Sequence, residues 1–160
     1  MFFIIHELLH LLGSVIAGIT IYFIYAGKMK LSQKKRSLIL LLCIMAGLLG
    51  DFFIDLDHLI DYFLLFGASF HLDQFIKGTQ FALSGKNYVF FHAYEYPIIL
   101  FIIARFIKQK VFKMCVLAFA LGLLLHLIVD VNQNGMIIPA YSIIYRILHN
   151  FDLRYMHAPK

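Results

Sequence analysis

Four long apolar stretches, separated by short polar segments, dominate the pattern of hydrophobic positions along the chain. They cover residues 2–27, 37 to about 57 or beyond, 88–107 and 111–131. In a helix, about 20 apolar residues are enough to cross the ~30 Å hydrocarbon layer of a bilayer. The pattern therefore predicts an all-α, polytopic integral membrane protein with about four transmembrane helices.

The remaining segments are more polar but still contain large apolar side chains. Residues 64–86 include several Gly, Ser and His residues, which favour a re-entrant or interfacial stretch over another crossing. Residues 132–160 mix Tyr, Arg and His with Ile and Leu, as an interfacial amphipathic segment or cap does. Because no Pro-, Gly- or Ser-rich linker interrupts the chain, we expect residues 1–160 to form one membrane-embedded helical domain.

Composition agrees with a lipid environment. Hydrophobic residues make up 62% of the 160 residues and charged residues only 14%. Soluble domains are less than about 50% apolar and about 25% charged. The composition therefore excludes an ordinary soluble domain and makes the lipid bilayer the expected partner of this chain.

The formal net charge of +5 comes largely from two short basic runs that lie between apolar stretches. Basic loops that connect membrane helices are usually retained in the cytoplasm. We therefore expect both runs on the cytoplasmic side of the cell membrane, and we do not expect nucleic acid as a partner. The runs are Lys28, Lys30, Lys34, Lys35 and Arg36, then Arg105, Lys108, Lys110 and Lys113.

Acidic and histidine side chains recur at one depth in all four predicted helices. With a rise of about 1.5 Å per residue, the height of each group can be counted from the nearest basic residue. In the first predicted helix His10 lies at about 27 Å, and in the second Asp51 lies at about 22 Å and Asp55 at about 28 Å. In the third, His92 lies at about 24 Å and Glu95 at about 20 Å, and in the fourth His126 lies at about 20 Å and Asp130 at about 26 Å. Ionisable groups thus share one layer near the extracytoplasmic side.

This layer needs a compensating partner, because inserting an ionisable group into hydrocarbon costs about 2.5–3.5 kcal/mol. The basic residues lie on the far side of the membrane and cannot be this partner. A bound cation is the remaining candidate. Pairs three or four residues apart share a helix face, and imidazole with carboxylate suits zinc, manganese or iron. We predict one or two divalent ions, with zinc favoured, held by His10, Asp55, His58, His92, His126 and Asp130.

The first helix opens with His6-Glu7-Leu8-Leu9-His10, which matches the H-E-x-x-H motif of zinc metalloproteases. In that motif two histidines one turn apart bind the metal and Glu acts as the general base. So short a match has an appreciable chance rate in a chain with eight histidines. Because His10 lies nearer the common layer, we predict it as a ligand and place His6 second.

Three short motifs lie at residues 50–58 (GDFFIDLDH), 91–95 (FHAYE) and 122–130 (GLLLHLIVD), followed by Asn134-Gly135 and Pro139. Together they resemble the YdjM-type family of membrane-bound metal-dependent hydrolases, which is similar in turn to zinc-dependent phospholipase C domains. The resemblance places an Asp-x-Asp-His element on Asp55, Asp57 and His58, the central His on His92, and a final pair on His126 and Asp130.

Two positions depart from the family pattern. Ile54 stands where the family usually has Pro, and Ala93-Tyr94-Glu95 replaces the usual Ser context, which leaves Glu95 as a substitute ligand. A bound metal would acidify water, and a spare carboxylate would take the proton. Asp51, Asp57 and Glu95 are the candidates for this catalytic role.

We therefore favour metal-dependent hydrolysis in the outer half of the bilayer, with a phosphoester of a phospholipid-like amphiphile as substrate. A site that opens laterally into lipid suits such a molecule. Two alternatives stay open: an intramembrane zinc metalloprotease that uses His6, Glu7 and His10, and a non-enzymatic metal or proton transporter. Breaks inside membrane helices would favour transport, and the sequence offers little beyond Gly13, Gly18 and Gly47 for them. The oligomeric state is left open.

Overall fold

The computed structural model describes residues 2–27 and 29–157, with side chains from residue 5 onward. Lys28 of the first basic run and residues 158–160 of the predicted tail lie outside the described residues. Within the described part the chain is helical and contains no strand, only two isolated β-bridges. The predicted all-α class is therefore confirmed.

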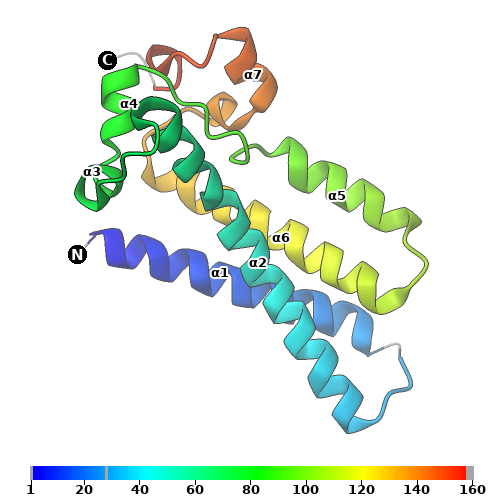
Figure 1. Cartoon of the computed structure of the whole chain (residues 1–160). Helices are drawn as coiled ribbons and strands as arrows, with labels where there is room; N and C mark the ends of the chain where they lie inside the picture. Colours follow the sequence, from blue (N-terminus) through cyan, green and yellow to red (C-terminus); the bar gives the residue numbers. More distant parts are fainter. Residues whose placement is uncertain (1, 28, 158–160) are drawn as a thin grey trace.

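Three helices are long and the others are short (Figure 1). The long ones are α1 (Phe2–Ala26), α2 (Gln33–Phe66) and α6 (Lys110–Gln133). The short ones are α3 (Leu72–Ile76), α4 (Thr79–Ser84), α5 (Glu95–Phe106) and α7 (Ile143–Leu148), with the 3-10 turns η1 (Ile138–Tyr141) and η2 (Leu153–Tyr155).

The three long helices are long and apolar enough to cross a membrane, whereas four crossings are not confirmed. α5 has 12 residues, which span only about 18 Å. The predicted helix over residues 88–107 is wrong over residues 88–94, because residues 85–94 form a loop. Backbone N–H groups of this loop donate to the carboxylates of Asp57 and Asp61 instead of to helical carbonyls.

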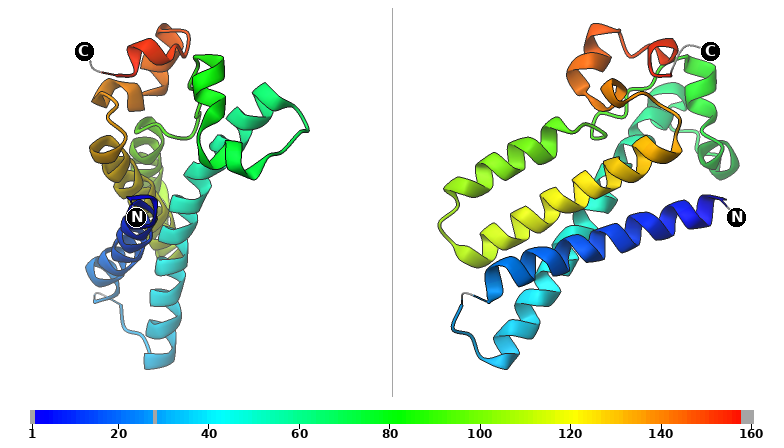
Figure 2. Two further views of the ribbon diagram at one scale, coloured as in Figure 1. Left: turned by 90° about the vertical axis from the view of Figure 1, so that its left-hand side faces the viewer. Right: turned by 180° about the vertical axis from the view of Figure 1, so that it is seen from behind.

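α1, α2 and α6 pack closely against one another, and α5 packs along α6 (Figure 2). A Cβ atom at Gly47 would lie 2.4 Å from the carbonyl oxygen of Ser14, and one at Gly122 would lie 2.4 Å from the carbonyl oxygen of Gly47. Small residues allow such close contact between membrane helices. Gly18 and Gly47, which the sequence offers as helix breaks, are instead packing positions in unbroken helices.

The two ends of the molecule differ in character. The α1–α2 and α5–α6 connections, which carry basic residues, lie at one end, and α3, α4 and α7 lie at the other (Figures 1 and 2). Between the ends, large apolar side chains such as Phe23, Phe52 and Phe112 are exposed by 70%, 66% and 59%. Such outward faces suit lipid, so the described helices fit a membrane protein.

We predict that Gly47→Ala lowers the stability of the protein by about 1–3 kcal/mol, the usual cost of overpacking a close contact. Gly13→Ala is the matched control, because a Cβ there would meet its nearest neighbour, Leu125 Cβ, at an ordinary 3.5 Å. Thermal unfolding of both variants in detergent is the measurement. Equal stability of the two variants would show that the helices are not held at this distance.

Candidate functional site

Histidine and aspartate side chains from α1, α2, α6 and the 85–94 loop meet near the end of the molecule that carries α3 and α4. His10, His92, His126 and Asp130 are almost fully buried, with at most 4% exposed. Each imidazole lies within 4 Å of at least one carboxylate, and these contacts form an unbroken network. We call this group the His/Asp cluster; it contains His6, His10, Asp51, Asp55, His58, His92, His126 and Asp130.

Three atoms of the cluster have a spacing that suits a metal ion. The Nε2 atoms of His92 and His126 each lie 3.4 Å from Asp130 Oδ2, and the donor atoms of these three residues are all within 4.8 Å of one another. Donors at about 2.0–2.1 Å from a tetrahedral zinc ion are about 3.3–3.4 Å apart. These three atoms, the first donor set, could therefore hold a metal ion. Asp55 Oδ1 lies beside them, 3.6 and 3.4 Å from the Nε2 atoms of His92 and His126.

The other oxygen of Asp130 faces a second group of donors. Asp130 Oδ1 lies 3.5 Å from the Nε2 atoms of His6 and of His10, and these two nitrogens are 3.0 Å apart. Three protein donors leave a fourth tetrahedral position open, as in catalytic zinc sites. We call these three atoms the second donor set. The Asp130 carboxylate thus lies between two places where a metal ion could bind.

Asp51 and Asp57 lie behind the imidazoles, on the Nδ1 side of the rings. Asp51 Oδ1 is 2.8 Å from His126 Nδ1, and Asp57 Oδ1 is 3.0 Å from His92 Nδ1. A carboxylate on Nδ1 selects the tautomer whose Nε2 lone pair is free for a metal. Two of the three residues that the sequence offers as catalytic, Asp51 and Asp57, therefore orient histidine rings here. α2 continues unbroken through Asp57. The Asp57 carboxylate faces the Nδ1 atom of His92 and is not one of the atoms of the first donor set.

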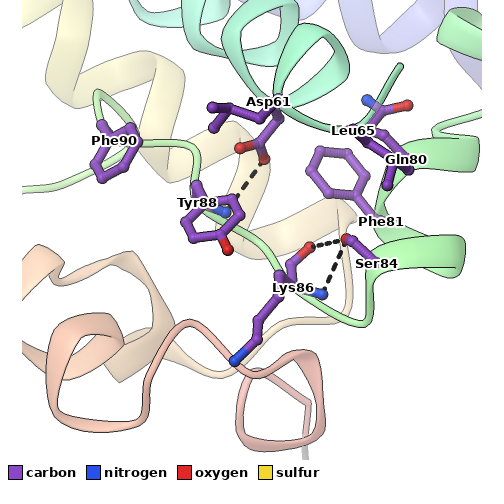
Figure 3. Close-up of a pocket in the computed structure, with 9 residues that line it drawn as sticks. Asp61, Leu65, Gln80, Phe81, Ser84, Lys86, Tyr88 and Phe90 are labelled. Atoms are coloured by element: carbon purple, nitrogen blue, oxygen red, sulfur yellow. Dashed lines mark hydrogen bonds between the residues drawn. The ribbon is translucent and has the colours of Figure 1, made fainter. Parts of the chain in front are cut away.

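The segment that carries His92 is fixed from two sides. Asp57 Oδ2 accepts the N–H groups of Phe91 and His92, and Asp61 Oδ2 accepts those of Tyr88 and Val89. Asp61, whose bond from Tyr88 is drawn in Figure 3, is itself only 5% exposed, so both carboxylates bond the loop from inside the protein.

Arg146 of α7 holds the same segment from the opposite side. It is fully buried, and its guanidinium donates to the carbonyl oxygens of Tyr88, Val89 and His92 at 3.2, 2.5 and 2.7 Å. Burial lowers the pKa of Arg146, and the nearby carboxylates of Asp57 and Glu95 oppose that shift. Sequence reasoning missed this role, since nothing in the spacing of Arg146 links it to the loop.

Glu95 and His58 differ from the other predicted site residues in their position. The Glu95 carboxylate accepts hydrogen bonds from the Ser142 hydroxyl and from the N–H groups of Ile143 and Ile144, so it ties α5 to α7 and is not in the cluster. His58 Nε2 is 3.8 Å from Asp55 Oδ1, and Asp55, His58 and His92 offer donor atoms that all lie within 4.8 Å of one another, so His58 keeps its predicted place as a candidate ligand. His6, which the sequence ranks behind His10 as a metal ligand, contacts Asp130 as closely as His10 does.

A large cavity of about 1110 Å³ opens beside the cluster. His6, Asp55, His58, His92 and Asp130 line one part of it, and apolar side chains from α1, α3 and α4 line another. The side chain of Asp55 is 45% exposed, which makes it the most accessible carboxylate of the cluster. The donor atoms therefore adjoin a space large enough for a small-molecule ligand.

Comparison of the chain with protein-family models, with curated proteins and with solved structures gives no match. The fold and the site described above consequently rest on the residues of this chain alone. The resemblance to the YdjM-type family stays a hypothesis.

We predict that the purified protein holds two divalent metal ions per chain, and that Asp130→Ala removes most of both, because Asp130 faces both donor sets. His6→Ala should remove about one ion, and Asp73→Ala, at an exposed carboxylate of α3, should remove none. Elemental analysis after dialysis measures this, with circular dichroism as a check on folding. Equal metal content in the wild type and in Asp130→Ala would exclude the cluster as the metal site.

Proposed function

We propose that this protein is a membrane-embedded, metal-dependent hydrolase that cleaves a phosphoester of an amphiphilic substrate. The observation that carries the proposal is the position of Asp130, whose two oxygens face separate donor sets beside one large cavity. Two metal ions about 3.5–4 Å apart are a common device for displacement at phosphorus. The resemblance to metal-dependent hydrolases supports the same chemistry.

A divalent metal bound here would lower the pKa of water and polarise a phosphoryl oxygen. The residues of the chain have separate tasks. His92 and His126 would hold the metal through Nε2, and Asp57 and Asp51 hold these rings in orientation. Asp55 is the carboxylate that we assign to accept the proton of the attacking water, because it lies beside the first donor set and its side chain is more exposed than that of Asp51, the other acid of α2 in the cluster.

The surroundings of the cavity favour an amphiphile over a fully polar substrate. Apolar side chains such as Ile5, Ile76 and Phe81 face the same cavity as the cluster. Ile76 and the neighbouring Leu72 of α3 are exposed by 60% and 61%, which suits contact with lipid. A substrate with an apolar tail and a phosphorylated head can satisfy both halves of the site.

The second candidate is an intramembrane metalloprotease. It is favoured by the convergence of His6 and His10, from the H-E-x-x-H motif, on the second donor set, with Glu7 lining the cavity. In that mechanism Glu7 is the general base. Transport has less support, because the three long helices are continuous where a transporter needs broken ones.

For sidedness we propose that the cluster lies toward the extracytoplasmic surface. Both basic connections lie at the end of the molecule opposite to α3, α4 and α7 (Figure 2), and basic loops are usually cytoplasmic.

The two enzyme mechanisms use Glu7 and His126 differently, and this separates them. For hydrolysis we expect phospholipid headgroup release that survives Glu7→Gln but falls by about 10²- to 10⁴-fold in Asp55→Asn, the usual contribution of a general base, and is lost in His126→Ala. The assay follows headgroup release from mixed phospholipids and cleavage of membrane-helix peptides. Peptide cleavage that Glu7→Gln abolishes, without lipid turnover in the wild type, would favour the protease instead.

The orientation can be measured by cysteine labelling in a variant in which Cys43 and Cys115 are replaced by Ala. We expect Lys34→Cys in the first basic run to react with a membrane-impermeant maleimide only after the cells are permeabilised. Asp73→Cys, at an exposed position of α3, should react in intact cells. The reverse pattern would place the site on the cytoplasmic side.

A further inference from the structure

The two donor sets differ in what stands behind their imidazoles. In the first donor set, the Nδ1 atom of each histidine lies within 3.0 Å of a carboxylate oxygen. In the second, His6 Nδ1 lies 2.7 Å from Oε1 of Gln133, a neutral amide. His10 Nδ1 has no hydrogen-bond partner among the described residues, since Asp51 Oδ1 is 3.7 Å away. Because partners on the far ring nitrogen strengthen a histidine ligand, the second donor set is the weaker of the two.

The hydrogen bond to Gln133 prepares His6 as a ligand. An amide oxygen only accepts, so the ring proton of a neutral His6 lies on Nδ1 and the lone pair of Nε2 is free for a metal ion. The same Nε2 atom lies 3.0 Å from Nε2 of His10 and 3.5 Å from Oδ1 of Asp130. Gln133 thus acts on the second donor set through one ring and does not contact the first.

The second donor set is also the more accessible one. The side chains of the first donor set are at most 5% exposed, whereas that of His6 is 22% exposed. His6 and Gln133 both line the large cavity. An ion held by His6 therefore adjoins open space through which it can exchange.

We propose that the second donor set holds the weaker, exchangeable ion of the two, and that Gln133 is a positioning residue that sets the affinity for this ion through His6. The inference rests on the metal-dependent chemistry of the proposed function. The first donor set keeps its ion as a fixed part of the site, and the occupancy of the second follows the concentration of free divalent metal around the protein. Metal supply then regulates the site.

Stepwise removal of zinc tests the difference between the two sets. The full-length protein in detergent is dialysed against buffers in which a competing chelator sets the free zinc concentration, and elemental analysis gives the ions that remain. We expect two steps, with affinities at least about tenfold apart. His6→Ala should lack the weaker step and keep the tighter one. Release of both ions in a single step would overturn the proposal.

Variants of Gln133 test its role as a positioning residue. Gln133→Leu should weaken the weaker step by about 10- to 100-fold, the usual effect of losing the partner of a metal-bound histidine, and should leave the tighter step unchanged. Gln133→Glu should strengthen the weaker step, because a carboxylate replaces the amide. Gln33→Leu is the matched control, since this exposed glutamine begins α2 far from the cluster in the sequence. Unchanged steps in Gln133→Leu, or equal weakening of both, would contradict the assigned role.

Cobalt gives a readout that loss of packing alone would not move, because its visible absorption reports the ligands of the bound ion. In Gln133→Leu, the band that appears with the second equivalent of cobalt should change and the band of the first should not. Two-step zinc release in a protein without lipid turnover would overturn the proposed function and leave this inference standing. Lipid turnover in a protein that binds one ion at every zinc concentration would overturn this inference and leave metal-dependent hydrolysis standing.

Discussion

The carboxylate of Asp57 takes the place of helical carbonyls as acceptor for the backbone N–H groups of Phe91 and His92. Hydrocarbon offers no water to unpaired backbone groups, so irregular backbone survives near membrane depth only where protein groups satisfy it. Asp61 and Arg146 complete this task for Tyr88 and Val89. The loop brings His92 to the cluster, and the first donor set therefore depends on these hydrogen bonds as much as on the ligands themselves.

The close contact of α1, α2 and α6 is the second requirement. Asp130 comes from α6, Asp55 from α2 and His10 from α1. The contacts between their side chains and the neighbouring donors therefore depend on how far apart the three helices lie. Gly47 and Gly122 let the helix backbones touch, which fixes the distance between the helices more firmly than flexible side chains would. A cluster of ionisable groups that is shared by three helices also ties their positions together, because each buried group would be costly without its partners.

Much of the cluster could be predicted from the sequence, because depth along a helix follows directly from residue count. His10, Asp51, Asp55, His126 and Asp130 lie on α1, α2 and α6, where the rise per residue is regular, and these residues do come together. The predicted helix over residues 88–107 begins too early, because apolar content alone does not show where a helix begins. Pro97 gave a signal, since Pro belongs in the first turn of a helix and α5 indeed begins at Glu95.

Roles that depend on tertiary contact were harder to predict. Glu95 shares the spacing of a ligand with His92, but the two residues lie on different elements, so helical periodicity does not apply to them. Asp61 and Arg146 bond to backbone atoms, which leave no trace in the sequence pattern. The orienting roles of Asp51 and Asp57 likewise follow only from the side of each imidazole that they face.

The length of α2 has a consequence for the surrounding lipid. Its 34 residues extend over about 51 Å, well beyond the ~30 Å hydrocarbon layer. In Figures 1 and 2 the helix crosses α1 and α6 at a clear angle. Tilt and protrusion together accommodate such an excess, and the fit changes with bilayer thickness. A thicker membrane would draw the cluster deeper below the headgroups and a thinner one would lift it toward them, so lipid composition itself becomes a variable that sets access to the site.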